Sequence, residues 1–145
     1  MIRTRSMAVL LLLTLAALPA AAGTASGEYV FKMDVPQELG VVVEEGLTIQ
    51  TVLFYTAGRG PASFFRVGNV MKAEIAISNV SEEGKMVGLA VALFDEKGKL
   101  LGVASGGNKF LPQRDERQRT YTLVFNHVNS LADTAASFKV TVETR

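Results

Sequence analysis

The feature of this sequence that most constrains the fold is a repeated alternation of apolar and polar side chains with a period of two. Residues 71–78 read MKAEIAIS, in which Met71, Ala73, Ile75 and Ile77 form an apolar series. Successive side chains of a β-strand point to opposite faces, so this spacing predicts a strand with one face on a core. The same spacing predicts strands at 87–94, 120–125 and 138–143.

Further strands are predicted on weaker patterns. Residues 100–104 follow the 87–94 strand, and shorter candidates lie at 29–33, 41–43 and 63–67. Residues 47–56 are a stronger candidate, with Leu47, Ile49, Leu53 and Tyr55 expected on one side.

Turn-forming residues separate these segments. EEG at 44–46, GRGP at 58–61 and NVSEEG at 79–84 have turn composition. Only Ser130 to Asp133 has the spacing of a helix capping box, and it predicts at most a turn or two. About seven to nine short strands joined in this way predict an all-β, antiparallel β-sandwich.

Two residue counts limit the chemistry. The chain has no cysteine, so the sandwich must be held by its core, and thiolate catalysis, iron–sulfur clusters and Cys-ligated metals are excluded. His127 is the only histidine, which argues against zinc or copper sites built from several imidazoles. We therefore predict no cofactor and no metal.

The N-terminus has the pattern of a signal peptide. Arg3 and Arg5 precede an apolar run from Met7 to Leu18, which is too short to span a bilayer. The AAA at 20–22 fits a signal peptidase, so cleavage is predicted before Gly23. This divides the chain into a signal peptide, 1–22, and a single domain, 23–145, that is periplasmic or secreted and has no stable membrane insertion after cleavage. The alternative is an uncleaved anchor.

The charge balance gives no reason to expect a polyanionic partner. Without Arg3 and Arg5, the 15 basic residues fall to 13, against 14 acidic ones. A near-neutral surface argues against nucleic acid or anionic lipid as a partner.

The C-terminal half resembles a known family. An alternating strand ending in Asn (AEIAISNVSEEG) is followed by VALFDEKGKLLG, a loop with Leu-Pro (FLPQRDERQ), TYTLVF and SFKVTVET. This order is similar to the FxLYD-type immunoglobulin-like domains of bacterial envelope proteins, over roughly residues 71–144. The namesake motif falls on 91–95, where Val91 and Phe94 replace its first Phe and its Tyr. The resemblance implies an immunoglobulin-like sandwich outside the cytoplasm and no catalytic residues.

The charged stretch DEKGK at 95–99 lies between two predicted strands. Asp95 can bond its own backbone at the start of a turn, and Gly98 can adopt a positive φ. A calcium loop would need alternating oxygen ligands, and Lys97 would repel the cation. The stretch is therefore predicted to be a hairpin turn.

Two groups of residues are candidates for a protein interface. Phe64 and Arg66 would share one face of a strand, and an exposed aromatic beside an arginine is typical of interfaces. The segment QRDERQR supplies Arg114, Arg117 and Arg119, either as a docking patch or as a solvated loop or protected sheet edge.

Other candidate sites are weaker. His127 has no nucleophile tied to it, and SGG at 105–107 is turn-like and not a nucleophile elbow. The pairs Glu44–Glu45 and Glu82–Glu83 are expected to be solvated turn residues and not an acid/base pair. Asn79-Val80-Ser81 fits a glycosylation sequon, which matters only in a eukaryotic secretory pathway.

These observations favour a non-enzymatic envelope protein that binds another envelope protein, with recognition at edge strands and loops. A small-ligand or glycan-binding module is the alternative, and a carboxylate-based hydrolase is a third hypothesis for which the chain offers no nucleophile–base arrangement.

Overall fold

The computed structural model describes residues 23–57, 70–126 and 132–145. The predicted signal peptide, the GRGP turn, the 63–67 strand with Phe64 and Arg66, His127 and the start of the capping box at Ser130 all lie outside these residues. The described residues form eight strands and one short 3₁₀ helix, η1 (Ala132–Thr134). The strands are β1 (Thr24–Val30), β2 (Gln37–Glu44), β3 (Leu47–Ala57), β4 (Val70–Asn79), β5 (Lys85–Asp95), β6 (Leu100–Leu111), β7 (Asp115–Phe125) and β8 (Ala135–Thr144).

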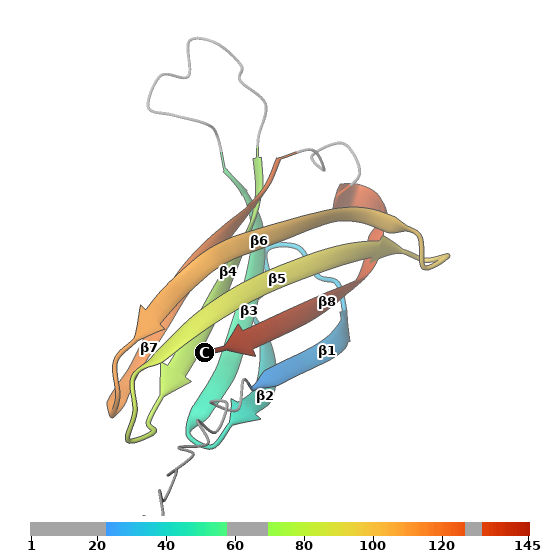
Figure 1. Ribbon diagram of the computed structural model, residues 1–145. Helices are drawn as coiled ribbons and strands as arrows, with labels where there is room; N and C mark the ends of the chain where they lie inside the picture. The colour runs from blue at the N-terminus through green and yellow to red at the C-terminus, as the bar shows by residue number, and fades with distance from the viewer. Residues whose placement is uncertain (1–22, 58–69, 127–131) are drawn as a thin grey trace, which may run out of the picture.

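The strands form two antiparallel four-stranded sheets packed face to face (Figure 1). Sheet A has the order β1-β8-β5-β6, and sheet B has the order β2-β3-β4-β7. The chain passes from sheet B to sheet A after β4, returns after β6, and crosses again before β8. In an immunoglobulin-like sandwich, strands B and E pair in one sheet and C and F in the other. The pairs β4·β7 and β5·β8 reproduce this arrangement, which confirms the predicted fold class.

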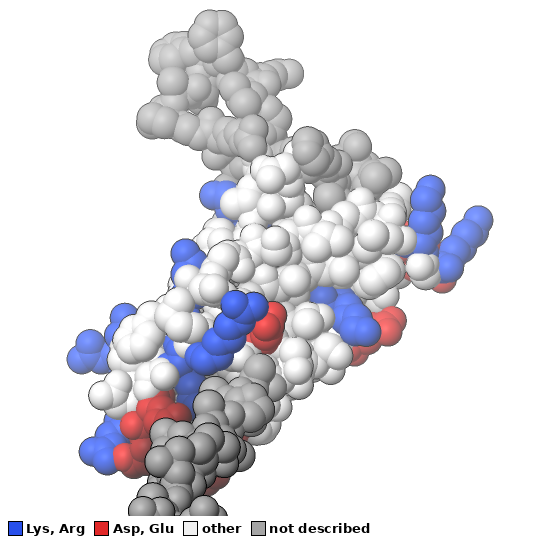
Figure 2. Space-filling model, in the orientation of Figure 1, with Lys and Arg blue, Asp and Glu red and all other residues white. Residues whose placement is uncertain are grey.

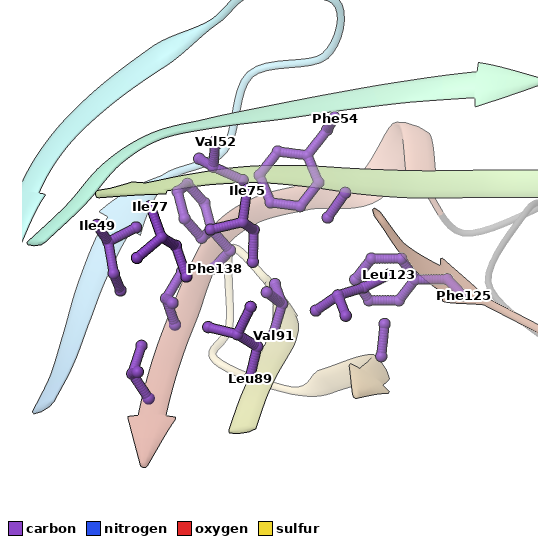
Figure 3. Close-up of a cluster of buried hydrophobic side chains, with 14 of the residues drawn as sticks. Ile49, Val52, Phe54, Ile75, Ile77, Leu89, Val91, Leu123, Phe125 and Phe138 are labelled. Atoms are coloured by element: carbon purple, nitrogen blue, oxygen red, sulfur yellow. The ribbon is translucent and has the colours of Figure 1, made fainter. Parts of the chain in front are cut away.

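The core lies between the sheets and is built from the predicted alternations. Ile75 and Ile77 of β4, Leu89 and Val91 of β5, and Phe138 of β8 point into it (Figure 3). All of them are buried, with at most 4% exposure. Burial of this apolar surface is the main driving force for joining the sheets.

Aromatic rings connect the two sheets at the centre of the core. Phe138 on β8 contacts Phe54 on β3 edge to face, with ring centroids 4.8 Å apart. Tyr29 on β1 stacks on Phe138 at 5.3 Å, and Phe31 packs on Phe54 at 4.9 Å. Such pairs add to the stabilisation from burial. The rings therefore tie β1 and β8 of sheet A to β3 of sheet B.

The predicted face of β3 is wrong beyond Ile49. Leu47 and Ile49 are buried as expected, but Leu53 and Tyr55 are only half-buried on the outer face, and Val52 and Phe54 are in the core. The cause is a β-bulge, because Ile49 pairs with Ile77 while Thr51 pairs with Ala76. The extra residue, Gln50, shifts the period by one and exchanges the two faces.

Two further predictions about strand limits are wrong. The strand predicted at 100–104 continues as β6 to Leu111, so the SGG at 105–107 lies within a strand and is not a turn. A register shift places Val87 opposite Lys109 and Leu89 opposite Gly106, so this segment forms a bulge. Likewise, β7 begins at Asp115 and not at the predicted residue 120, so most of QRDERQR is an edge strand, which is one of the alternatives given for it.

The hairpin turn predicted at residues 95–99 is present. Asp95 Oδ1 accepts hydrogen bonds from the backbone N–H groups of Lys97 (2.9 Å) and Lys99 (2.8 Å). The N–H of Gly98 donates to Asp95 O at 2.9 Å, and Gly98 has φ +74°. The charged side chains of this stretch thus belong to a turn that closes on its own backbone.

Two turn glycines provide a matched test of how closely the β2–β3 turn approaches the β4–β5 turn. Gly46 (φ +78°) and Gly98 (φ +74°) both have left-handed backbones, but a Cβ on Gly46 would lie 2.7 Å from Ser81 N, whereas a Cβ on Gly98 would meet nothing within 4 Å. We expect Gly98→Ala to lower the free energy of unfolding by about 1–2 kcal/mol, from backbone strain alone. Gly46→Ala should lower it by about 3 kcal/mol, because the β2–β3 and β4–β5 turns must also separate. Urea unfolding measures both, and equal losses would contradict the close approach of the two turns.

Candidate functional site

The described strands leave four sheet edges, β1, β6, β2 and β7, and the two of sheet B are irregular or charged. β2 contains two register shifts and Gly40 with φ +59°, which distort its backbone. β7 begins with DERQR, which has four charged side chains in five residues. Bulges and charges of this kind discourage a second chain from pairing with a sheet edge. The edges of sheet B are therefore protected.

The β6 edge of sheet A is different in composition. From Leu100 to Asn108, nine consecutive residues carry no charge and include no proline. The surface over β5 and β6 is accordingly almost free of charged side chains, which gather at the ends of these strands (Figure 2). β6 is the last strand of its sheet, so among the described residues no strand pairs with its outer side. A long uncharged edge is a template for strand addition.

The two halves of β6 differ in how far they are covered. Near its end, Tyr121 Oη of β7 donates to Phe110 O at 3.5 Å, and the bulge at Gly106 interrupts the ladder. A Cβ on Gly106 would lie 2.7 Å from Leu123 of β7. In the first half, Leu100–Ser105, no described side chain hydrogen-bonds to the strand, although Ala104 packs into the core. We call this half the β6 edge segment.

Apolar side chains line the outer face of the β6 edge segment. Leu100 is 52% exposed and Val103 is 53% exposed. They pair with Phe94 and Ala92 of β5, and partners across an antiparallel ladder share a face. These four side chains form an outward apolar patch next to the free strand edge.

The predicted interface residues lie elsewhere, or outside the described chain. Phe64 and Arg66 are outside it. Arg114 has a left-handed backbone (φ 51°) in the β6–β7 connection, and its guanidinium pairs with Glu82. Arg119 pairs with Asp115, with Nε and Oδ2 2.8 Å apart. Arg117 is exposed. These three predicted interface arginines thus lie around the start of β7, and two of them are already bound to carboxylates of this chain.

The Asp115–Arg119 pair also shifts the pKa of the Asp115 carboxyl group. The pKa of Asp115 is lowered, first because Arg119 donates a hydrogen bond to its carboxylate and second because the Arg117 N–H donates to it at 3.1 Å. These bonds favour the ionised form of Asp115, whose carboxylate joins the two ends of the DERQR segment at 115–119. The arrangement fits the alternative of a protected sheet edge better than a free docking patch.

The two glutamate pairs come together at one end of the sandwich. The β2–β3 turn and the β4–β5 turn line a cleft of about 640 Å³ that contains Glu44, Glu45, Glu82, Glu83 and Lys85. Lys85 Nζ lies 3.1 Å from Glu83 Oε2 and 3.5 Å from Glu44 Oε1. The hydrogen bond to Glu83 is the main reason why the pKa of Lys85 is raised. Glu45, Glu82 and Glu83 are exposed, as expected for turn residues.

Asn79, the first residue of the sequon, is buried and fully bonded. Its Nδ2 donates to Glu83 O (2.9 Å), Pro112 O (3.0 Å) and, at 3.4 Å, Leu111 O. Its Oδ1 accepts from the Oγ and N–H of Ser81. Asn79 therefore fastens the end of β4 to its own turn and to the β6–β7 connection.

Within the described ranges, no three His, Cys, Asp or Glu side chains are grouped so that they could hold a metal ion. No helix in the described part of the chain has the length and apolarity needed to cross a membrane. A scan against protein-family models and a search of the curated proteins both found no match to this sequence.

The Asn79 network generates a stability prediction. Asn79→Ala removes the amide from three carbonyls and two Ser81 groups in a buried position, so we expect the free energy of unfolding to fall by about 2–4 kcal/mol. Asn108→Ala, at an exposed position, should change it by less than about 0.5 kcal/mol. Chemical unfolding monitored by circular dichroism compares them. If the two variants lose the same amount, Asn79 is not the fastening of these turns.

Proposed function

We propose that this chain is an exported, non-enzymatic β-sandwich that binds another envelope protein by adding one of the partner's strands to its β6 edge segment. The observation that supports this most directly is the contrast between the edges. The sheet B edges carry charges or a distorted backbone, while β6 begins with an uncharged, apolar segment that pairs with β5 without a shift from Gly102 to Gly106. An edge of this kind is an aggregation hazard unless a partner uses it.

The chemistry of the edge indicates what the partner segment looks like. Added strands bind through backbone hydrogen bonds, and alternate side chains provide specificity. The partner segment would place apolar side chains beside Leu100 and Val103. Lys99 and Lys109 flank the uncharged run, so acidic residues at the ends of the partner segment would complement it.

Three features of the sequence support the other parts of the proposal. The Arg3 to Ala22 leader pattern supports export to the periplasm or beyond the cell. The resemblance of residues 71–144 to FxLYD-type domains supports an envelope setting and a structural role for the 91–95 motif. The absence of cysteine and the single histidine leave few routes to catalysis.

A groove on sheet B favours the second candidate, a small polar ligand or glycan. Glu38, Gln50, Thr51 and Gln118 supply carboxylate, amide and hydroxyl groups to this groove, next to Gly40. Such groups suit a polyhydroxylated ligand. None of its described lining residues is aromatic, so it lacks a stacking surface for a sugar ring, and we rank it second.

Cross-linked affinity capture tests the main proposal. Tagged protein is expressed with its leader in its native cells, lightly cross-linked, and purified for mass spectrometry of the cross-linked peptides. Val103→Lys places a charge on the β6 edge segment and should reduce recovery of the partner at least about tenfold. Val42→Lys is the matched control, because Val42 is 65% exposed on the edge strand of the other sheet.

Each outcome of this capture has one meaning. Cross-links to Leu100–Ser105 that disappear in Val103→Lys support strand addition there. A partner that is kept by Val103→Lys and lost in a Phe64→Ala/Arg66→Ala double variant would move the interface to the face predicted from sequence. A partner kept by every variant would contradict both faces, and enrichment of glycan alone would favour the groove on sheet B.

A further inference from the structure

The Glu44 carboxylate lies beside Gly23, at the residue where cleavage of the leader is predicted. The N–H of Gly23 donates to Thr144 Oγ1 at 2.9 Å, and Gly23 O accepts from Thr144 N at 2.9 Å. A Cβ on Gly23 would lie 3.4 Å from Glu44 Oε2. The Gly23 nitrogen is bonded to the same Cα and lies about 2.5 Å from that position, hence within about 6 Å of the carboxylate.

Glu44 lacks a partner for one of its oxygens. Its Oε1 is buried and accepts no hydrogen bond, and its nearest cation is Lys85 Nζ at 3.5 Å. The side chain as a whole is 22% exposed. Gly23 lies nearer to the other oxygen, Oε2. An incompletely bonded, partly buried carboxylate is costly, so a positive charge brought close to it would be stabilising.

The charges around Glu44 are also unbalanced. Lys85 on β5 is a single cation between Glu44 on β2 and Glu83 in the β4–β5 turn. At the end of β8, the cation Arg145 is already paired with Glu143 at 3.3 Å. One further positive charge near Gly23 would bring the Glu44–Lys85–Glu83 group to neutrality.

We propose that Glu44 and Thr144 form a binding site for the α-ammonium group of Gly23, which exists only after the leader is removed. Hydrolysis of the Ala22–Gly23 peptide bond replaces one N–H donor with an ammonium group that has three. One hydrogen keeps the bond to Thr144 Oγ1, and the positive charge faces the Glu44 carboxylate. Processing therefore stabilises the junction of β1, β2 and β8. The inference rests on the proposed export, because cleavage before Gly23 creates the charge.

A double-variant cycle on purified protein tests this site. Protein that begins at Gly23 is prepared by cleavage of a fusion, with the α-amine either free or acetylated, in the wild type, Glu44→Gln and Glu45→Gln. We expect acetylation to lower the Tm of the wild type by roughly 2–6 °C. The Glu45→Gln control should lose the same amount, because Glu45 is an exposed turn residue. Glu44→Gln should lose less than half of it.

Two further measurements keep the test independent of the folding of Glu44→Gln and of export. In the free-amine wild type, the NMR pKa of the Gly23 amine should lie above the ordinary range of about 7.7–8.0. A pKa within or below that range, or an equal acetylation loss in Glu44→Gln, overturns the site. Mass spectrometry of the protein from exporting cells should give Gly23 as the first residue. Cleavage at another bond overturns this inference and leaves strand addition standing, while absence of any cleavage overturns both the inference and the proposed export.

Discussion

The contact between Phe138 and Phe54 is the interaction on which the rest of the structure depends. Many β-sandwiches hold their sheets together with a disulfide, but this chain has no cysteine. Phe138 and Phe54 come from different sheets and meet at 4.8 Å, and Tyr29 and Phe31 extend the cluster to β1 and to the segment after it. The β-bulge at Gln50 is what turns Phe54 inward. An irregularity of the backbone is thus a condition for the core.

The ends of the sandwich are held by polar contacts, since a core between two sheets does not fix the turns. At one end, Asn79 connects the end of β4 to the β4–β5 turn and to the β6–β7 connection. The Arg114–Glu82 pair joins this turn and this connection at the surface. Asp95 closes the turn at the other end. With both ends fixed, β6 is held in place as an edge strand, although its pairing with β5 contains two register shifts. The fixed ends hold the uncharged edge in the position that the proposed strand addition requires.

The sequence predicted those parts of the fold that follow from local alternation. The core faces of β4, β5 and β8 were predicted because their period of two is unbroken, as in Phe138 and its neighbours. The prediction failed where a bulge changes the period, at Gln50 and near Gly106, because a bulge depends on the partner strand and not on local pattern. The candidate interface was harder to predict from the sequence than the fold. Arg114 and Arg119 have the composition of an interface, but their pairing with Glu82 and Asp115 depends on tertiary structure. The uncharged run that marks the β6 edge segment was visible in the sequence, but it became informative only once β6 proved to be an edge.

The central claim is that the β6 edge segment is open to a partner strand, unlike the charged or distorted edges of sheet B. Amide hydrogen exchange of the protein from Gly23 to Arg145, alone and with its cross-link partner, tests it most directly. We predict that without the partner alternate amides of Leu100–Ser105 exchange quickly while those of β5 and β8 are protected, and that with the partner the fast amides of this segment become protected. Protection gained instead on β2 or β7, or a segment already fully protected without the partner, would contradict the account.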